Sequence, residues 1–389
     1  MKFCATIAEY NPLHNGHLKH IEYIKNELKA ENLVVVMSGN FTQRGEPAVL
    51  NKFKRARQAI IAGADAVIEL PTVFATANAE LFASGGIKTI NSMGIVDGIC
   101  FGAENGNKSD FISLASALNS ETKDFKKTLK DYLSGGISLA KAKFLTVQSL
   151  YGDMFDESLM NSPNNILGLE YTKAILKTNP SIDIFPMLRE GDHNDLTLKK
   201  GITSATSIRK AIKEGKFRKT KKCMPPYVYR ELEDYPFEAD KITMAKIITS
   251  SAEELAKISD CTEGLENRIK ALAKDNFNID KYVEKVATKR YPATRIRRIL
   301  TANLLGIEES FIFDALSSPL YIKVLAVKKD SDVLPLICEK ATVPVLTRKS
   351  DADKLKKTAL ACFNKDVLAN DLYNLFKNER ENEHKTLFV

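Results

Sequence analysis

A chain of 389 residues, 44% of them hydrophobic, is long enough for two ordinary domains, and we expect two. No apolar run approaches the eighteen or more residues that cross a bilayer, and no secretory signal pattern follows Met1, so the sequence argues against a membrane protein and predicts a cytoplasmic one. Six cysteines without a CxxC pair argue against a disulfide framework and a zinc ribbon, and the net charge of +8 is unevenly placed.

The first predicted strand and helix frame a short polar turn. Residues 3–8 form an apolar run typical of a buried strand, and apolar residues recur at helical spacing over 18–28. Between them lies the run HNGH at 14–17. A strand-turn-helix unit points free backbone N–H groups and the positive end of the helix dipole at the turn, where an anion such as a nucleotide phosphate fits. Gly16 leaves room for it, and the imidazoles can donate hydrogen bonds to it.

Two other interpretations of these histidines stay open. Histidines near a helix start are often polar surface or capping residues, and four letters alone do not exclude this. Zinc binding is the second alternative, although His14 and His17 lack cysteine or carboxylate partners at ligand spacing. The strand before the motif and the helix after it favour the phosphate site, because the motif needs that context to work.

Strands and helices continue to alternate up to residue 101. We expect strands at 33–38, 66–70 and 96–101, separated by helices at 51–62 and 78–93. Such alternation builds a parallel sheet covered on both faces, and ligands then bind beyond the carboxyl ends of the strands. The HNGH turn, the segment at 38–43 and Gly102 each follow a strand, so these three loops are expected to meet on one rim.

The middle of the chain is expected to be mostly helical. Residues 108–151 are predicted to form helices with a break at 134–136. A loop at 161–165 leads into a helix at 166–177, and a further strand is expected at 181–188.

A polar loop follows that strand and begins with Arg189, on the same rim. Beyond it, Ser204 or Thr206 can cap a helix that runs to residue 213 and contains Arg209. The start of this helix offers free N–H groups to a phosphate, and a guanidinium can hold phosphate oxygens bidentately, which a lysine cannot. An N-cap alone would also explain Ser204, and the two interpretations are compatible.

The positive charge gathers in two stretches. Over 199–222 ten basic residues face a single acidic one, Glu214, and a second group of five basic residues surrounds Tyr291. Basic clusters beside an aromatic ring suit a polyphosphate backbone and a stacked base, although a solvated helix face is the plain alternative for each. The residues expected to bind nucleic acid are Lys219, Lys221, Lys222, Lys289, Arg290, Arg295, Arg297 and Arg298.

From Met224 onward the alternation stops and helical patterns dominate, with short strands able to return at 320–327 and 341–346. We therefore expect an α/β fold with two domains. Residues 1–223 would form a parallel, Rossmann-like nucleotide-binding sheet. Residues 224–389 would form a mainly helical domain that exposes the basic face of the helix near Arg295.

Longer motifs surround these features. AEYNPLHNGH at 8–17 is followed by VVVMSGNFTQRGEPAVLNKFKRARQAIIAGADAVIELP at 34–71, GICFGAE at 98–104, SPNNILGLEY at 162–171, SATSIRKAI at 204–212, LENRI at 265–269 and TKRYPATRIRRIL at 288–300. Together they resemble the bacterial tRNA(Met) cytidine acetate ligase family, which has an HxGH nucleotidyltransferase-like fold of the HUP type.

The resemblance implies an ATP-dependent ligase. Such an enzyme activates acetate as acetyl-AMP with release of pyrophosphate and transfers the acetyl group to N4 of the wobble cytidine of elongator tRNA(Met), forming N4-acetylcytidine. Mg²⁺ is expected because polyphosphate substrates usually carry it. The residues expected to bind ATP are Ile7, Ala8, Glu9, Tyr10, Asn11, Pro12, Leu13, Asn15, Gly16, His20, Gly102, Asn164, Asn165, Arg189 and Ser204.

This chemistry needs few reactive side chains. A carboxylate cannot acylate an amine in water until it has been converted into a mixed anhydride with AMP, and that step needs an in-line approach and positive donors. We expect His14, His17 and Arg209 to supply these donors as the catalytic residues. Two rivals stay open, a small-molecule adenylyltransferase and a non-catalytic RNA-binding protein. The basic helical region argues against the first, and the intact HNGH motif with Arg209 argues against the second. The motifs alone do not select the carboxylate or the tRNA.

Overall fold

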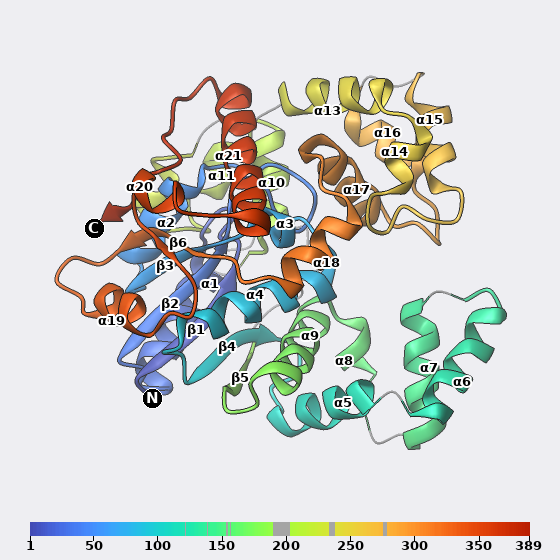
Figure 1. Cartoon of the computed structure of the whole chain (residues 1–389), viewed down its shortest axis with the longest axis horizontal. Coiled ribbons are helices and arrows are strands. Elements are labelled where there is room, and N and C mark those ends of the chain that lie inside the picture. Colours follow the sequence, from blue (N-terminus) through green and yellow to red (C-terminus); the bar gives the residue numbers. More distant parts are fainter. Residues whose placement is uncertain are drawn as a thin grey trace.

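An eight-stranded sheet forms the centre of the computed structural model (Figure 1). The structure describes residues 1–120, 122–137, 139–152, 155, 157–189, 203–232, 238–274 and 278–389. The strand order is β5-β4-β1-β2-β3-β6-β7, and β8 pairs with β6. The strands are β1 (Phe3–Ala8), β2 (Asn32–Ser38), β3 (Ala66–Leu70), β4 (Gly98–Ala103), β5 (Asp183–Leu188), β6 (Ile322–Val327), β7 (Val345–Leu346) and β8 (Leu387–Phe388).

The first five strands run parallel, and helices cover both faces of their sheet. Along β2, Val34 and Val36 belong to one hydrophobic cluster, whereas Val35 and Met37 belong to the other. This alternation explains why the strand is apolar on both sides. The prediction of a parallel α/β sheet is therefore confirmed. Helices α4 (Ala79–Met93) and α9 (Pro163–Thr178) cover the first face, and α1 (Asn15–Glu22), α2 (Lys52–Ile61) and α10 (Ala205–Lys213) cover the second.

The remaining helices lie around this core. Helices α6 and α7 pack against each other as a hairpin, and α13 to α17 form a separate group beside the sheet (Figure 1). Within the described ranges, none of the helices combines the length and the apolar composition that a bilayer crossing requires. The helices other than α1, α2, α4, α9 and α10 are η1 (Tyr23–Glu27), α3 (Thr72–Ala75), α5 (Lys108–Ser120), α6 (Lys123–Ser134), α7 (Leu139–Tyr151), α8 (Ser158–Asn161), α11 (Phe217–Thr220), α12 (Pro226–Tyr229), α13 (Glu238–Thr249), α14 (Ala252–Ala256), α15 (Leu265–Ala273), α16 (Ile279–Val286), α17 (Ala293–Leu305), α18 (Glu309–Ser317), α19 (Val333–Lys340), α20 (Lys349–Ala352) and α21 (Lys357–Lys377).

The end of the chain returns to the sheet that the first part of the chain begins. β6 pairs antiparallel with β3, and β7 and β8 pair with β6. The returning strands cover the edge that β3 would otherwise expose. The stretch predicted as a mainly helical domain, 224–389, therefore contributes three strands to the sheet that 1–223 begins, and its helices are α12 to α21. The short strands expected at 320–327 and 341–346 correspond to β6 and β7.

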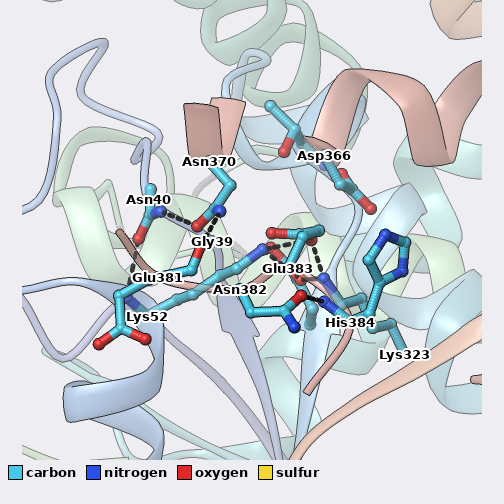
Figure 2. A network of polar contacts seen from close by, with 12 residues as sticks. Gly39, Asn40, Lys52, Lys323, Asp366, Asn370, Glu381, Asn382, Glu383 and His384 are labelled. Carbon is cyan, nitrogen blue, oxygen red and sulfur yellow. Dashed lines mark hydrogen bonds and ion pairs between the residues drawn. The ribbon is translucent and has the colours of Figure 1, made fainter. Parts of the chain in front are cut away.

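A buried network of charges joins this returning segment to the loop after β2 (Figure 2). Lys52 at the start of α2 lies 2.7 Å from a carboxylate oxygen of Glu69 in β3 and 2.7 Å from one of Glu383 near the C-terminus. Lys323 of β6 contacts the same two carboxylates. All four side chains are buried, so each charge depends on the others for compensation.

Candidate functional site

A cavity of about 200 Å³ opens at the carboxyl ends of β1, β4 and β5, the rim at which the sequence predicted a site. The predicted residues that line it are Ile7, Ala8, Glu9, Tyr10, Asn11, His17, His20, Gly102, Asn164, Arg189 and Arg209. The loops after β1 and β5 and the last residues of β4, which include Gly102, therefore meet the start of α9 and the start of α10 at one place.

The HNGH turn forms the entrance of α1 and holds itself together. His14 is the N-cap, and its Nδ1 accepts a hydrogen bond from the backbone N–H of Gly16 at 3.0 Å. The backbone N–H of His14 donates in turn to Nδ1 of His17 at 3.2 Å. Because both Nδ1 atoms accept, the proton of each neutral ring must lie on Nε2. The capping and phosphate-binding interpretations are therefore compatible in this structure.

Burial keeps these rings neutral. It lowers the pKa of His14 to about 3, with further lowering by the cationic Arg189 and Arg209. Burial and the neighbouring His14 also lower the pKa of His17 well below its ordinary value. His17 lines the cavity, whereas His14 is 2% exposed and lies behind it. The structure thus presents His17 as a neutral N–H donor to whatever anion occupies the cavity.

Two arginines supply the positive charge of the same wall. Arg209 of α10 is buried and donates to the backbone oxygen of Asn11 at 2.9 Å and to Oγ1 of Thr206 at 3.3 Å. Arg189 follows β5, and its backbone N–H donates to the oxygen of Ala103. A Cβ atom on Gly102 would lie 3.1 Å from Cγ and Cδ of Arg189. The lack of a side chain at Gly102 therefore lets this arginine lie across the end of β4.

Several predicted ATP-binding residues have structural roles instead of lining the cavity. Asn165 is fully buried and accepts hydrogen bonds from the backbone N–H groups of Glu104 and Asn105 at 2.8 and 3.0 Å. Ser204 is the N-cap of α10 and accepts from the N–H of Ser207. The other predicted residues outside the cavity wall are Pro12, Leu13, Asn15 and Gly16.

Gly16 instead borders a smaller hollow of about 90 Å³ on the other side of the histidines, beside Lys19 and Leu188. Asn15 holds the start of α1 in place, because its backbone N–H donates to the oxygen of Cys223 and its side chain to the oxygen of Lys222.

Sequence reasoning missed part of the cavity wall. Gln43 and Arg44, in the loop after β2, lie on it, and the backbone N–H of Gln43 donates to Oε1 of Glu9 at 2.8 Å. The position of this loop after a strand was the available signal, and it placed residues 38–43 on the rim without selecting a side chain. Phe82 and Tyr171 gave no such signal, because their place on the wall depends on how α4 and α9 pack on the sheet. The other wall residues that were not predicted are Thr6, Phe82, Phe101, Leu167, Tyr171 and Ala205.

The first basic stretch lies beside this site. Lys219, Lys221 and Lys222 are exposed, and the hydrogen bond from Asn15 to the oxygen of Lys222 places them next to the start of α1. The lysines at 199 and 200 lie outside the described residues.

The second basic group is paired with acids from distant elements, which corrects the prediction of an exposed basic face on α17. Arg297 contacts the carboxylate of Asp280 in α16, and Arg298 lies 3.7 Å from that of Asp260. Arg295 donates to the backbone oxygen of Asp260 at 2.8 Å.

Only the two basic residues before this helix stay well exposed among the five predicted. They are Lys289 and Arg290, and Arg290 pairs with Glu263 at the surface. Arg297 and Arg298 therefore form ion pairs within the helical group, whereas the sequence predicted that they lie exposed on its surface.

No group of three or more His, Cys, Asp or Glu side chains in the described part of the chain could hold a metal ion. An anionic substrate is the occupant that the arginines, the neutral histidines and the start of α1 favour.

Known proteins resemble this chain along its whole length. Residues 1–386 match the model of the HIGH Nucleotidyl Transferase family. A tRNA(Met) cytidine acetate ligase of Thermoanaerobacter sp. (strain X514) is 39% identical, with 97% of this chain and 96% of that protein covered. The crystal structure of apo Thermotoga maritima TmcAL has a TM-score of 0.94 at 28% identity, and that of the same protein bound with alpha-thio ATP has a TM-score of 0.90 at 28% identity. Both structures cover the whole of both chains.

Proposed function

The chain belongs to the HIGH nucleotidyl transferase family, among the tRNA(Met) cytidine acetate ligases, and on this premise we propose that it is an ATP-dependent acetate ligase. It activates acetate as acetyl-AMP and transfers the acetyl group to N4 of the wobble cytidine of elongator tRNA(Met). The observation that carries this proposal is the convergence of His17, Arg189 and Arg209 on one cavity at the start of a helix.

The first step joins acetate to the α-phosphate of ATP. A carboxylate oxygen of acetate attacks the α-phosphorus, the bond from that phosphorus to the bridging oxygen of the β-phosphate breaks, and pyrophosphate leaves with the electron pair. The Nε2–H of His17 and the guanidinium groups of Arg189 and Arg209 stabilise the charge that develops on the phosphate oxygens. His14 acts through His17, because its backbone N–H fixes that ring.

The second step uses the mixed anhydride. The exocyclic N4 of cytidine attacks the carbonyl carbon of acetyl-AMP, the bond from that carbon to the AMP oxygen breaks, and N4 loses a proton. AMP is the leaving group. No side chain forms a covalent bond with the acetyl group in either step, so the site needs positioning and charge stabilisation alone.

The tRNA is proposed to bind across the surface that carries Lys219, Lys221 and Lys222. These exposed lysines adjoin the start of α1 through Asn15, so phosphates of the RNA backbone would lie close to the cavity. Lys289 and Arg290 offer a second exposed basic point near the helical group. Arg295, Arg297 and Arg298 support the helical group and are left out of the proposed RNA contacts.

Mg²⁺ belongs to the proposal as a companion of ATP, whose polyphosphate would bring it to the site. The cytoplasm is the proposed compartment, because tRNA and ATP meet there.

The direct test is a reaction with labelled acetate, ATP, Mg²⁺ and total bacterial tRNA. We expect label to enter tRNA only when ATP is present, with one pyrophosphate released per acetyl group transferred. Release of pyrophosphate without labelled tRNA would identify a different carboxylate or acceptor. The absence of both signals would contradict the proposed function and favour an RNA-binding protein.

A further inference from the structure

Arg44 lies on the cavity wall, as do the two arginines assigned to the phosphates, Arg189 and Arg209. It comes from the loop after β2, whereas Arg189 follows β5, and the strand order β5-β4-β1-β2 separates these two strands by three places. With neighbouring strands about 4.8 Å apart, the two loops enter the cavity from points roughly 14 Å apart. The cavity therefore has a guanidinium at each end of this row of strands.

The loop that carries Arg44 is tightly built. The backbone N–H of Gly45 donates to the oxygen of Thr42 at 2.9 Å, and that of Thr42 donates to the oxygen of Glu46 at 3.1 Å. The N–H of Gln43 donates to the carboxylate of Glu9 at 2.8 Å. These bonds hold the tip of the loop, and with it Arg44, at the edge of the cavity.

Two further contacts fix the loop relative to the rest of the site. Gly45 has a φ of +72°, and a Cβ atom there would lie within 2.5 Å of the backbone of Arg297 in α17. The carboxylate of Glu46 lies 3.4 Å from Nζ of Lys213, on the helix that carries Arg209. The loop is therefore braced on one side by the helical group and on the other by α10.

In-line displacement requires acetate and pyrophosphate to lie on opposite sides of the α-phosphorus. If pyrophosphate leaves toward His17, Arg189 and Arg209, the carboxylate must approach from the side of β2. Glu9 also lines the cavity on that side, and its negative charge would repel acetate unless a cation lay beside it. Arg44 is the cation that the loop after β2 brings to the wall.

We propose that the guanidinium of Arg44 binds the carboxylate of acetate and aims it at the α-phosphorus. This inference rests on the proposed function, because it names the site of one substrate of that reaction. One carboxylate oxygen attacks while the other stays hydrogen-bonded to Arg44. In the second step the same donor faces the carbonyl oxygen, on which negative charge develops as N4 attacks.

The test compares Arg44→Gln and Arg44→Lys with the wild type in tRNA acetylation, titrating acetate at saturating ATP and tRNA. Loss of one charge-assisted hydrogen bond predicts an acetate KM that is about ten- to a hundred-fold higher in Arg44→Gln, with partial recovery in Arg44→Lys. ATP binding, measured by calorimetry on each protein in the absence of acetate and tRNA, should stay within twofold. Arg348→Gln, at an exposed arginine on the edge of α20, is the matched control and should leave the acetate KM unchanged.

The outcomes separate the two proposals. If the wild type does not transfer acetate to tRNA, the proposed function fails. If the wild type is active and Arg44→Gln keeps its acetate KM within twofold, the assignment of Arg44 is wrong. A parallel loss of ATP affinity would also overturn it, because Arg44 would then belong to the nucleotide site.

Discussion

The ring of His14 lies face to face with the ring of His17, with centroids 3.8 Å apart and planes inclined by 24°. Each ring also accepts a backbone hydrogen bond through Nδ1, so neither can turn without breaking one. Two imidazolium charges at this separation in a buried turn would repel each other strongly. The pair is therefore best suited to work as two neutral rings, one of them facing the cavity.

Replacement of His17 should separate catalysis from RNA binding. His17→Ala removes the Nε2–H donor at the cavity, and we expect the rate of acetyl transfer to fall by about 10²- to 10³-fold. Binding of tRNA in a filter assay should change little, because the exposed lysines lie outside the cavity. Equal losses in both assays would show that His17 supports the fold or the RNA surface instead.

The stability of the protein should fall as the pH falls below about 6.5. The pKa of His14 is lowered to about 3 and that of His20 to about 4, so the unfolded chain binds more protons than the folded one between these values and 6.5. The contribution of the neutral rings is thus complete above pH 6.5 and is lost as the pH falls toward 3 to 4.

Urea unfolding of the wild type and of His14→Gln at pH 7 and pH 5 measures this effect. We expect the wild type to lose more stability between the two pH values than the variant, because carboxyl groups titrate equally in both. Identical losses would mean that His14 does not contribute to the pH dependence.

The exposed lysines beside α1 should determine the salt dependence of tRNA binding. Simultaneous replacement of Lys219, Lys221 and Lys222 by Gln should weaken binding and reduce the slope of log K against log salt by about 0.7 to 0.9 for each RNA phosphate that the variant no longer neutralises. The control is the same replacement at three exposed lysines near the start of α21, which should leave the slope unchanged. These are Lys354, Lys356 and Lys357.

Arg297 should matter for stability more than for RNA. It pairs with Asp280 across α16 and α17, and its side chain is only 19% exposed. Arg297→Gln should lower the midpoint of urea unfolding while the salt slope of tRNA binding stays at the wild-type value. A flattened slope with an unchanged midpoint would restore the original expectation that this helix contacts RNA.

Glu383→Ala should destabilise the whole protein. Lys52 and Lys323 would then share the single carboxylate of Glu69 in a buried site, and a broken buried ion network of this kind typically lowers the free energy of unfolding by about 3 to 5 kcal/mol. Glu238→Ala, which breaks a surface pair with Lys241, should stay within about 0.5 kcal/mol. Equal effects of the two variants in urea unfolding would contradict the role of the network.

The local sequence pattern was enough to predict the parallel strands of the sheet and the part of the cavity wall that the HNGH turn, Gly102 and Arg189 form. Residues close together in the sequence determine the strands β1 to β4 and the HNGH turn. The position of Gly102 and Arg189 on the rim follows because the carboxyl ends of parallel strands lie at one edge of the sheet. The pairing of Arg297 with Asp280, or of Arg298 with Asp260, depends on how helices pack. Nothing within the arginine cluster itself indicates its acidic partners.

The pairing of the C-terminal strands could not be predicted from local sequence either. β6 is a short apolar run that the sequence could identify, but its place beside β3 joins segments about 250 residues apart and has no local signal. The aromatic side of the cavity, with Phe82 and Tyr171 from two helices, likewise exists only once α4 and α9 pack on the sheet.

The contact between Lys52 and Glu383 has a consequence for the order in which the molecule forms during synthesis. Every residue that lines the cavity precedes residue 210. The loop that carries Gln43 and Arg44 nevertheless leads directly into Lys52, whose charge is compensated in part by Glu383. The site can therefore reach its final geometry only after the ribosome has completed residue 383, so we expect a nascent chain stalled before that point to bind ATP poorly.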